Sequence, residues 1–401
     1  MQQNLNEITF LFSDSGKLEN IRERSSDEIF PDMGIAFLSA LSNELMKSPK
    51  VRQFSDVATF AFFCRKANLL ALKKKYSEDS IRLGRGVVFH VAPSNVPVNF
   101  AYSMVAGILS GNINIVRVPS KLFEQVDLIC DAIQKITLTS EFNEFGNRLF
   151  LVRYDRQSTV TDFLSSICDV RVIWGGDDTI EQIRKSAIPA RSYDVTFADR
   201  YSLAAINANK FIHEQNTAKI AEDFYNDTYL FDQNACSAPR LIIWNGEKDN
   251  IFKAKEMFWN AIQIKIEKYE LSPILSVDKL SAMYLQSQDT AKIKRELPVN
   301  NKLWRINVSE LTNDIDKNRC AGGYFIEYDA CSLKELKAIV NRKYQTLAYY
   351  GFEIKELSKL VREMKFTGID RIVPIGKTTE FSLTWDGYDL INVLSRKCMI
   401  L

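Results

Sequence analysis

Residues 87–118 read VVFHVAPSNVPVNFAYSMVAGILSGNINIVRV, and this stretch decides the fold. The segment 87–92 is rich in β-branched and aromatic residues, which favour a strand. Residues 97–109 are mostly apolar and suit a buried helix, and Gly111-Asn112 supplies a helix stop. A second apolar strand follows at 113–118. A strand, a helix and a strand in succession are typical of a parallel β-α-β unit.

The same alternation continues along the chain. Its strands read as continuous apolar runs, which a parallel sheet covered on both faces requires. The pattern therefore predicts a doubly wound nucleotide-binding α/β domain, preceded by a helical part. Further strands are expected at 148–153 and 170–174, and further helices at 34–46, 58–75, near 121–137 and from 178.

A second α/β region is expected after a strand at 201–207. Its expected helices lie near 216–228, 251–268, 277–291 and 332–341, and its strands at 240–244, 324–328 and 346–350. The predicted organisation is an N-terminal helical part packing on the nucleotide-binding domain, that domain itself, a catalytic domain, and a C-terminal segment that returns to the first domain or to an oligomer interface. These four parts are expected at 1–80, 81–205, 206–365 and 366–401.

Composition excludes several classes of partner and site. The 52 Lys and Arg residues nearly balance the 50 Asp and Glu residues, so there is no basic field to attract nucleic acid. The start lacks the basic and apolar regions of a signal peptide. Seven scattered cysteines with no CxxC spacing predict a reducing cytoplasm and no metal site. With only two histidines, a multi-histidine site is excluded.

No residue from 86 to 116 carries a formal charge, and this length exceeds the roughly 20 residues of a membrane-spanning helix. Prolines and asparagines interrupt the stretch, however, and a bilayer would leave their polar groups unpaired. We therefore expect buried core and no integral membrane segment. His90, within the first strand, is expected to be a buried, hydrogen-bonded residue and not an acid–base group.

Asn95 lies in the turn between the first strand and the following helix. Such a turn lies at the carboxyl edge of a parallel sheet, where ligands bind. The asparagine amide offers two N–H donors without a charge, which suits an oxyanion that forms only in a transition state. The alternative is that Asn95 merely caps the turn.

Cys236 lies in the polar, small-residue segment Asn234-Ala235-Cys236-Ser237-Ala238-Pro239, just before the strand at 240–244. A cysteine in such a loop is exposed enough to ionise and attack. The other six cysteines are expected mostly in apolar helices or strands as inert core. Taken alone, any one cysteine is more often a small hydrophobe than a nucleophile.

Together these blocks resemble a known family. Residues 91–121 resemble the aldehyde dehydrogenase pattern of an asparagine loop, a helix, a Gly-Asn stop and a strand ending in Pro-Ser. Closer still, GRGVVFHVAPSNVPVNFAYS, SGNINIVRVPSK, VIWGGDD, NACSAPR and DRIVPIG with WDGYDL resemble the LuxC-type acyl-CoA reductase family. That family includes the reductase subunit of the bacterial bioluminescence fatty-acid reductase complex. The resemblance covers roughly residues 80–400.

The resemblance implies an aldehyde dehydrogenase-like fold and NADPH-dependent reduction of a fatty acyl thioester, acyl-CoA or acyl-protein, to the aldehyde. Cys236 matches the family's cysteine, which carries the acyl group. Asn95 matches the loop asparagine that holds the oxyanion, with the backbone N–H of Cys236 as a second donor. The family also implies a homo-oligomer and an acyl-activating synthetase as partner.

The resemblance also implies a set of cofactor-binding residues. Ser120 stands where NAD-preferring relatives often have a glutamate that would repel a 2′-phosphate. A serine there, beside Arg117 and Lys121, favours NADPH over NADH. Gly175-Gly176 resembles the family's glycine near the pyrophosphate, although an ordinary turn is an equal alternative. The predicted cofactor-binding residues are Ser94, Arg117, Ser120, Lys121, Gly175 and Gly176.

Two other activities remain open. Hydrolytic aldehyde dehydrogenases carry a glutamate that activates water, and Phe197 stands at about that position here. A shift of two residues would place Asp199 there, which would favour an aldehyde dehydrogenase that oxidises aldehyde to acid. The other alternative is a cofactor-free cysteine acyltransferase or thioesterase. The chain length of the acyl group is not fixed by the sequence.

Overall fold

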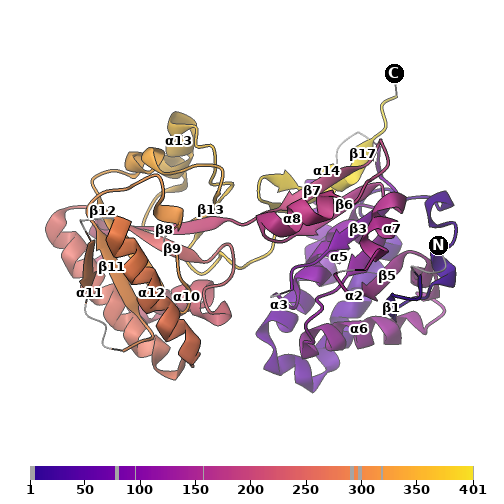
Figure 1. Cartoon of the computed structure of the whole chain (residues 1–401), viewed down its shortest axis with the longest axis horizontal. Helices are drawn as coiled ribbons and strands as arrows, with labels where there is room; N and C mark the ends of the chain where they lie inside the picture. The colour runs from indigo at the N-terminus through magenta and orange to yellow at the C-terminus, as the bar shows by residue number, and fades with distance from the viewer. Residues whose placement is uncertain are drawn as a thin grey trace. The chain divides into compact units, whose positions relative to one another are not determined.

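The computed structural model describes residues 5–76, 81–94, 96–156, 158–289, 293–296, 300–317 and 319–400. The chain forms two units (Figure 1). Unit 1 comprises Met1–Ala198 and Leu383–Leu401, and unit 2 comprises Asp199–Ser382. The boundary expected at 205/206 falls inside a strand of unit 2, and a strand cannot be divided between two cores. The C-terminal return to unit 1 begins at Leu383, later than the expected 366.

Among the described residues, unit 1 contains a six-stranded sheet in the order β1-β5-β4-β3-β6-β7. All strands run parallel except β1, which pairs antiparallel with β5 at one edge. The central strands are buried on both faces, which explains their continuous apolar runs. The strands are β1 (Thr9–Phe12), β3 (Val87–Val91), β4 (Ile113–Arg117), β5 (Leu149–Arg153), β6 (Val170–Trp174) and β7 (Tyr193–Phe197).

Helices cover both faces of this sheet. Residues of α7 and α8 pack on the face that carries Val87, Phe89 and Val91, whereas α5 contacts the opposite face at His90. The N-terminal helix α2 packs on α5 and α6, within unit 1. The helices are α2 (Asp32–Lys47), α3 (Ser55–Phe63), α4 (Lys66–Lys75), α5 (Asn99–Leu109), α6 (Glu124–Thr137), α7 (Val160–Ile167), α8 (Asp177–Arg184) and α14 (Leu390–Leu394).

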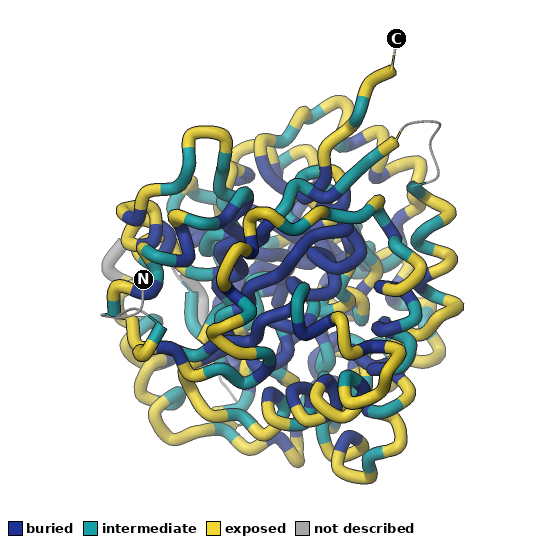
Figure 2. The backbone as a smooth tube through the Cα atoms, turned by 90° about the vertical axis from the view of Figure 1, so that its right-hand side faces the viewer, coloured by how far each residue is buried: buried dark blue, intermediate teal, exposed yellow. Residues whose placement is uncertain are grey.

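The uncharged stretch 86–116 folds as β3, α5 and β4, and most of its described residues are buried. In Figure 2 the buried backbone, drawn in dark blue, lies in the interior with exposed backbone around it. Gly107 allows α5 to approach the sheet, since a Cβ there would lie 1.8 Å from Oδ1 of Asn114. None of the helices in the described ranges is both long and apolar enough to cross a bilayer.

Some expected elements differ in detail. The helix expected at 58–75 is two helices, α3 and α4, with a break at Cys64-Arg65. The helix expected at 332–341 is a short 3-10 helix, η8 (Leu333–Ala338). Helix α7 and strand β7 were not expected. The pattern of β7, YDVTF, alternates polar and apolar residues because it is an edge strand, where Asp194 pairs with the buried Arg171.

The described part of unit 2 contains a seven-stranded sheet in the order β10-β11-β12-β9-β8-β13-β14. Its strands are parallel except β10. They are β8 (Tyr201–Asn207), β9 (Pro239–Asn245), β10 (Ile293–Glu296), β11 (Trp304–Val308), β12 (Tyr324–Ala330), β13 (Tyr344–Tyr350) and β14 (Arg371–Pro374). The helices are α9 (Ala208–Phe211), α10 (Thr217–Thr228), α11 (Lys248–Lys265), α12 (Pro273–Asp289) and α13 (Ile354–Met364).

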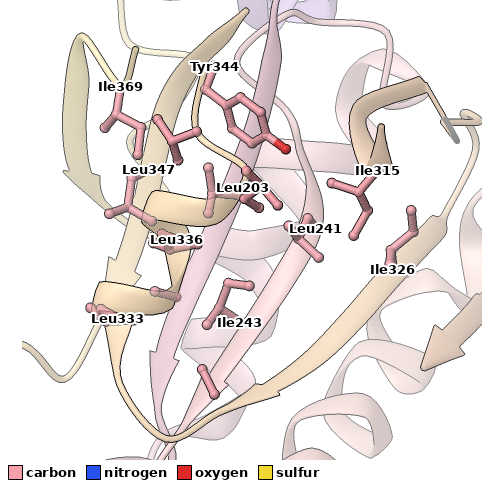
Figure 3. Packing of buried hydrophobic residues seen from close by; sticks show 14 of the residues in the cluster. Leu203, Leu241, Ile243, Ile315, Ile326, Leu333, Leu336, Tyr344, Leu347 and Ile369 are labelled. Carbon is pink, nitrogen blue, oxygen red and sulfur yellow. The ribbon is translucent and has the colours of Figure 1, made fainter. Parts of the chain in front are cut away.

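One core of unit 2 lies on the face of the sheet that η8 and α13 cover. In Figure 3, Tyr344 and Leu347 of β13 lie beside Leu203 of the neighbouring strand β8. Short elements complete the chain. They are the pairs β15 (Thr384–Trp385) with β16 (Tyr388–Asp389) and β17 (Ser395–Lys397) with β2 (Arg82–Gly84), and the 3-10 helices η1 (Gly16–Leu18), η2 (Ile21–Glu23), η3 (Pro49–Gln53), η4 (Asn143–Asn147), η5 (Tyr229–Phe231), η6 (Ile266–Lys268) and η7 (Ile315–Lys317). The predicted α/β, doubly wound fold class is confirmed.

Candidate active site

The predicted cofactor-binding residues come together at one edge of the sheet of unit 1. Strands β4, β3 and β6 are neighbours and parallel, so their carboxyl ends meet at the same edge. Ser94 follows β3, Arg117 ends β4 with Ser120 and Lys121 just beyond it, and Gly175-Gly176 follow β6. Asn95 belongs to the same loop as Ser94 but lies outside the described residues.

The strand order also places a topological switch point at this edge. From β3 the chain passes through α5 to β4 on one side, and from β5 it returns through α7 to β6 on the other side of β3. In such sheets the crevice outside the carboxyl ends of the two diverging strands is the usual ligand site. Here those strands are β3 and β6, which precede the loops of Ser94 and Gly175.

Arg117, Ser120 and Lys121 form a segment suited to a phosphate. The Arg117 guanidinium lies 4.4 Å from the centre of the Tyr154 ring, and its Nη2 donates to the Tyr154 carbonyl at 3.2 Å. Burial lowers the pKa of Arg117 from its ordinary value, while Ser120 and Lys121 are exposed. No acidic residue occurs from 117 to 123. A 2′-phosphate is bound by cationic side chains and hydroxyl donors, and a nearby carboxylate would repel it.

The two glycines meet the requirement of the pyrophosphate only in part. A Cβ on Gly176 would meet nothing within 4 Å, so the backbone there is open to close approach. However, α8 begins with Asp177 and Asp178. Carboxylates in the first turn already complement the positive end of a helix, which weakens this N-terminus as an anion site. The steric condition is therefore fulfilled and the electrostatic one is not.

His90 is part of a buried network below this edge. It is fully buried, with Nδ1 2.7 Å from Oγ of Ser103 and Nε2 3.1 Å from Oδ1 of Asn114. The indole of Trp174 donates to the same Ser103 hydroxyl at 3.0 Å. Burial lowers the pKa of His90 to about 4, so the ring is neutral at physiological pH. The expectation of a structural histidine is confirmed.

Phe197, at the position expected of a hydrolytic glutamate, ends β7. Its ring stacks on Trp174 with centroids 3.7 Å apart, and Tyr388 contacts it edge-on at 5.6 Å. Tyr388 follows the turn Asp386-Gly387, where both residues have positive φ, as two-residue hairpin turns require. The WDGYDL block thus forms a hairpin whose tyrosine supports the end of β7. This position carries an aromatic ring and no base.

Asp199, the alternative base, is engaged in ion pairs. Both of its oxygens accept from the guanidinium of Arg319, one of them at 2.9 Å, and Nζ of Lys343 lies 3.8 Å away. Burial raises the pKa of this carboxyl, but the hydrogen bonds and charge of Arg319 outweigh it and hold the pKa below its ordinary value. A carboxylate held in this way is a weak base for activating water.

Cys236 lies in the loop between η5 and β9, at the amino end of the sheet of unit 2. Asp232 and Gln233 begin this loop with φ of 52° and 61°. Non-glycine residues adopt this region only when their surroundings enforce it. The buried Gln233 side chain does so: Nε2 donates to the carbonyls of Pro239 (3.0 Å) and Tyr324 (3.1 Å), and Oε1 accepts from the N–H groups of Gly323 and Tyr324.

The Cys236 side chain is half-buried and contacts a side-chain amide. Nε2 of Gln345 lies 3.4 Å from Sγ of Cys236, within hydrogen-bonding range for sulfur. The backbone carbonyl of Cys236 accepts a hydrogen bond from Oγ of Ser202 at 2.7 Å. The residue is therefore only partly buried, and hydrogen bonds fix both its side chain and its backbone.

The other cysteines divide into two groups. Cys64, Cys130 and Cys168 are buried as expected, and burial raises the pKa of Cys130 and Cys168 to about 12. Cys331 is exposed, and Cys320 and Cys398 are half-buried, so the expectation of inert core is wrong for these three. Accessibility alone does not single out Cys236, and its contacts must distinguish it.

Comparison with known proteins identifies the family. The family model described as Acyl-CoA reductase (LuxC) matches residues 66–397. The chain belongs to this family. Two similar relatives are the long-chain acyl-protein thioester reductases of Aliivibrio fischeri, 26% identical over 314 residues, and Vibrio harveyi, 24% identical over 308 residues. Each match covers 74% of this chain and 60% of the relative. This acyl-CoA reductase family member therefore spans less than two thirds of the length of these relatives.

Solved structures show the same fold at low identity. Aldehyde dehydrogenase 21 from Physcomitrella patens superposes with a TM-score of 0.65 at 11% identity, covering 91% of this chain and 85% of that one. Glyceraldehyde-3-phosphate dehydrogenase from Methanocaldococcus jannaschii, in complex with NADP, superposes with a TM-score of 0.64 at 13% identity, covering 96% and 92%. At this identity the likeness establishes the aldehyde dehydrogenase fold alone.

The sequence pointed to Cys236 but not to the residues around it. Ser202 is the second residue of β8, and Gln345 and Thr346 are the second and third residues of β13; all three are almost fully buried. The one available signal was the polar pair Gln345-Thr346 at the beginning of an otherwise apolar strand. The roles of Cys236, Asn95 and the cofactor-binding residues stay predictions.

Proposed function

We propose that this protein reduces fatty acyl thioesters to aldehydes with NADPH, through an acyl group held on Cys236. Membership of the acyl-CoA reductase family supports the reaction class. The observation that carries the proposal is the environment of Cys236: a half-buried cysteine on a fixed loop, with its sulfur in contact with an amide N–H donor. A thiolate is the nucleophile that takes an acyl group from a thioester.

In the first half-reaction the Cys236 thiolate attacks the carbonyl carbon of the acyl thioester. A new S–C bond forms, the old one breaks, and the leaving thiolate takes a proton from water. One thioester replaces another, so this exchange is nearly balanced in free energy. The oxyanion formed during attack is held by the side-chain amide of Asn95 and the backbone N–H of Cys236.

In the second half-reaction NADPH, when bound, supplies a hydride to the carbonyl carbon. Asn95 and the Cys236 N–H hold the resulting thiohemiacetal oxyanion as they held the first. The C–S bond to Cys236 then breaks as the carbonyl re-forms. The products would be the aldehyde, NADP⁺ and the regenerated Cys236 thiolate.

Phe197 and Asp199, the two candidate positions for a water-activating base, favour reduction over hydrolysis. Phe197 carries no proton acceptor, and the carboxylate of Asp199 is paired with Arg319. If neither position activates a water, the acyl group stays on Cys236 until hydride arrives. These observations disfavour the alternative of an aldehyde dehydrogenase that releases acid.

Arg117, Ser120 and Lys121 support NADPH as the cofactor, with Ser94, Gly175 and Gly176 at the same sheet edge. The test is Ser120→Glu, which places a carboxylate beside the proposed 2′-phosphate. The ratio of NADPH to NADH affinity should fall about tenfold, equal to roughly 1.4 kcal/mol, in fluorescence titrations. The exposed Ser140→Glu is the matched control in the same unit. An unchanged ratio would place the 2′-phosphate elsewhere.

The acyl carrier is coenzyme A or a protein thiol. The two relatives are named for acyl-protein thioesters, which supports a partner such as an acyl-activating synthetase.

We also propose that the chain forms a homo-oligomer. Native mass spectrometry of the purified chain measures its oligomeric state directly.

The deciding experiment is mass spectrometry after incubation with hexadecanoyl-CoA and no cofactor. The peptide containing Cys236 should carry a hexadecanoyl adduct, and NADPH should discharge it as hexadecanal. A variant in which the exposed Cys331 is replaced by serine should behave identically. Free hexadecanoic acid as the product would favour a hydrolase, and an adduct indifferent to NADPH would favour an acyltransferase.

A further inference from the structure

We propose that Gln345 is a catalytic residue whose side-chain amide donates a hydrogen bond to the Cys236 thiolate and keeps the sulfur ionised. The inference rests on the proposed function, in which that sulfur is the reacting atom. Its starting point is the 3.4 Å distance from Nε2 of Gln345 to Sγ of Cys236. Both residues belong to unit 2.

Two irregularities of the sheet place Gln345 at the sulfur. In the pairing of β13 with β8, Tyr344 faces Tyr201 and Leu347 faces Leu203, so Gln345 and Thr346 together oppose the single residue Ser202. In the pairing of β8 with β9, the register also shifts, between Ser202 and Leu203. Bulges redirect side chains and are frequent next to active sites. Here both neighbours of β8 are irregular at Ser202.

The backbone of β13 at the bulge is linked through Ser202 to the loop that carries Cys236. The N–H of Thr346 donates to Oγ of Ser202 at 3.2 Å, and that hydroxyl donates to the carbonyl of Cys236 at 2.7 Å. Ser202 thus ties Cys236 to the same part of β13 that carries Gln345. The distance between amide and sulfur is therefore set by the sheet.

The orientation of the Gln345 amide is fixed as well. Its side chain is almost fully buried, and Oγ1 of Thr346 lies 3.3 Å from Oε1, which it serves as a donor. With the oxygen engaged by Thr346, the NH₂ group is the end presented to the sulfur. The assignment of the oxygen and the nitrogen of this amide follows from these hydrogen bonds.

An amide donor favours the thiolate over the thiol but has no site to take up the thiol proton. Gln345 therefore stabilises the thiolate without acting as the base that removes the thiol proton. A carboxylate in place of the amide would have the opposite effect, because it repels a thiolate.

The test measures the reactivity of Cys236 with iodoacetamide as a function of pH, by mass spectrometry of the peptide that contains it. The apparent pKa of alkylation should rise by about one unit in Gln345→Leu, a tenfold change in thiolate fraction, and by more in Gln345→Glu. Gln215→Leu, at an exposed glutamine of the same unit, should leave the profile unchanged. Circular dichroism and thermal unfolding report on the fold.

An unchanged alkylation profile in folded Gln345→Leu overturns the proposal. Should that variant fail to fold, Thr346→Val decides, since it removes only the hydroxyl that orients the amide and leaves the backbone bond to Ser202 in place. It should raise the apparent pKa in the same direction by a smaller amount, and no rise would also overturn the proposal. Alkylation needs neither acyl substrate nor NADPH, so its outcome is independent of the reductase test.

Discussion

The two units place their candidate residues at opposite ends of their parallel sheets. In unit 1 the predicted cofactor residues follow the carboxyl ends of β3, β4 and β6. In unit 2 Cys236 precedes β9, next to the amino ends of β8 and β13. The same strand–helix alternation therefore presents two chemically different edges.

The two edges also differ in the direction of the peptide dipoles. Helices begin at the carboxyl edge of a parallel sheet, and their N-termini favour anions such as phosphate. Helices end at the amino edge, and helix C-termini do not favour anions. A side-chain donor can stabilise a thiolate there, and the contact from Gln345 to Cys236 is such a donor. Holding the loop that carries Cys236 costs conformational free energy, because Asp232 and Gln233 adopt positive φ angles.

The largest expected effect is at the amino edge of unit 2. Cys236→Ser should lower acyl-CoA reduction by about a thousandfold or more, because a hydroxyl at neutral pH is a far weaker nucleophile than a thiolate. The measurement is NADPH consumption with hexadecanoyl-CoA. Cys331→Ser serves as the control, and equal losses in both variants would remove the special status of Cys236.

In the segment that follows β3 in the chain, Asn95→Ala should lower kcat about 10²–10³-fold, the usual effect of losing one oxyanion donor. Alkylation of Cys236 by iodoacetamide should be unchanged, because that reaction develops no oxyanion. The two measurements together separate the roles of the two edges. A variant with full activity would assign Asn95 to capping its turn.

The stability of unit 1 should depend on pH through His90. Its folded pKa, about 4, is below the ordinary 6.5, so the unfolded chain binds the proton more readily. The associated stability is present above pH 6.5 and is lost as the pH falls toward 4. Between pH 7 and 5 we expect a loss of about 2 kcal/mol, measured by hydrogen exchange in β3 and β4. The same slope in a folded His90→Gln variant would contradict this assignment.

Gly176→Ala should leave the stability of unit 1 unchanged, because the added Cβ meets no atom within 4 Å. If the pyrophosphate approaches this backbone, the Kd for NADPH should rise about tenfold, or roughly 1.4 kcal/mol, in a titration. Gly107→Ala is the contrasting variant, since its Cβ would overlap Asn114, and it should lower the melting temperature. An unchanged Kd would make Gly175-Gly176 an ordinary turn.

Much of unit 1 was predictable from local pattern. The strands at β3, β4 and β6 are continuous apolar runs, which a parallel sheet covered on both faces requires. The edge strand β7 escaped prediction because its pattern is polar on one face, where Asp194 pairs with Arg171. The boundary between the units escaped for a similar reason, since nothing in the sequence shows which sheet β8 joins.

The sequence by itself determined which residues lie at the carboxyl edge of the sheet of unit 1. The residues that directly follow a parallel strand lie at that edge whatever packs around the strand. It also determined that a cysteine in a small, polar loop precedes β9. Only the tertiary structure decided what touches that sulfur. Gln345 and Ser202 are distant from Cys236 in the chain, and they meet it because two strands shift register at the same point. Register depends on pairing across the whole sheet, which no local pattern of residues encodes.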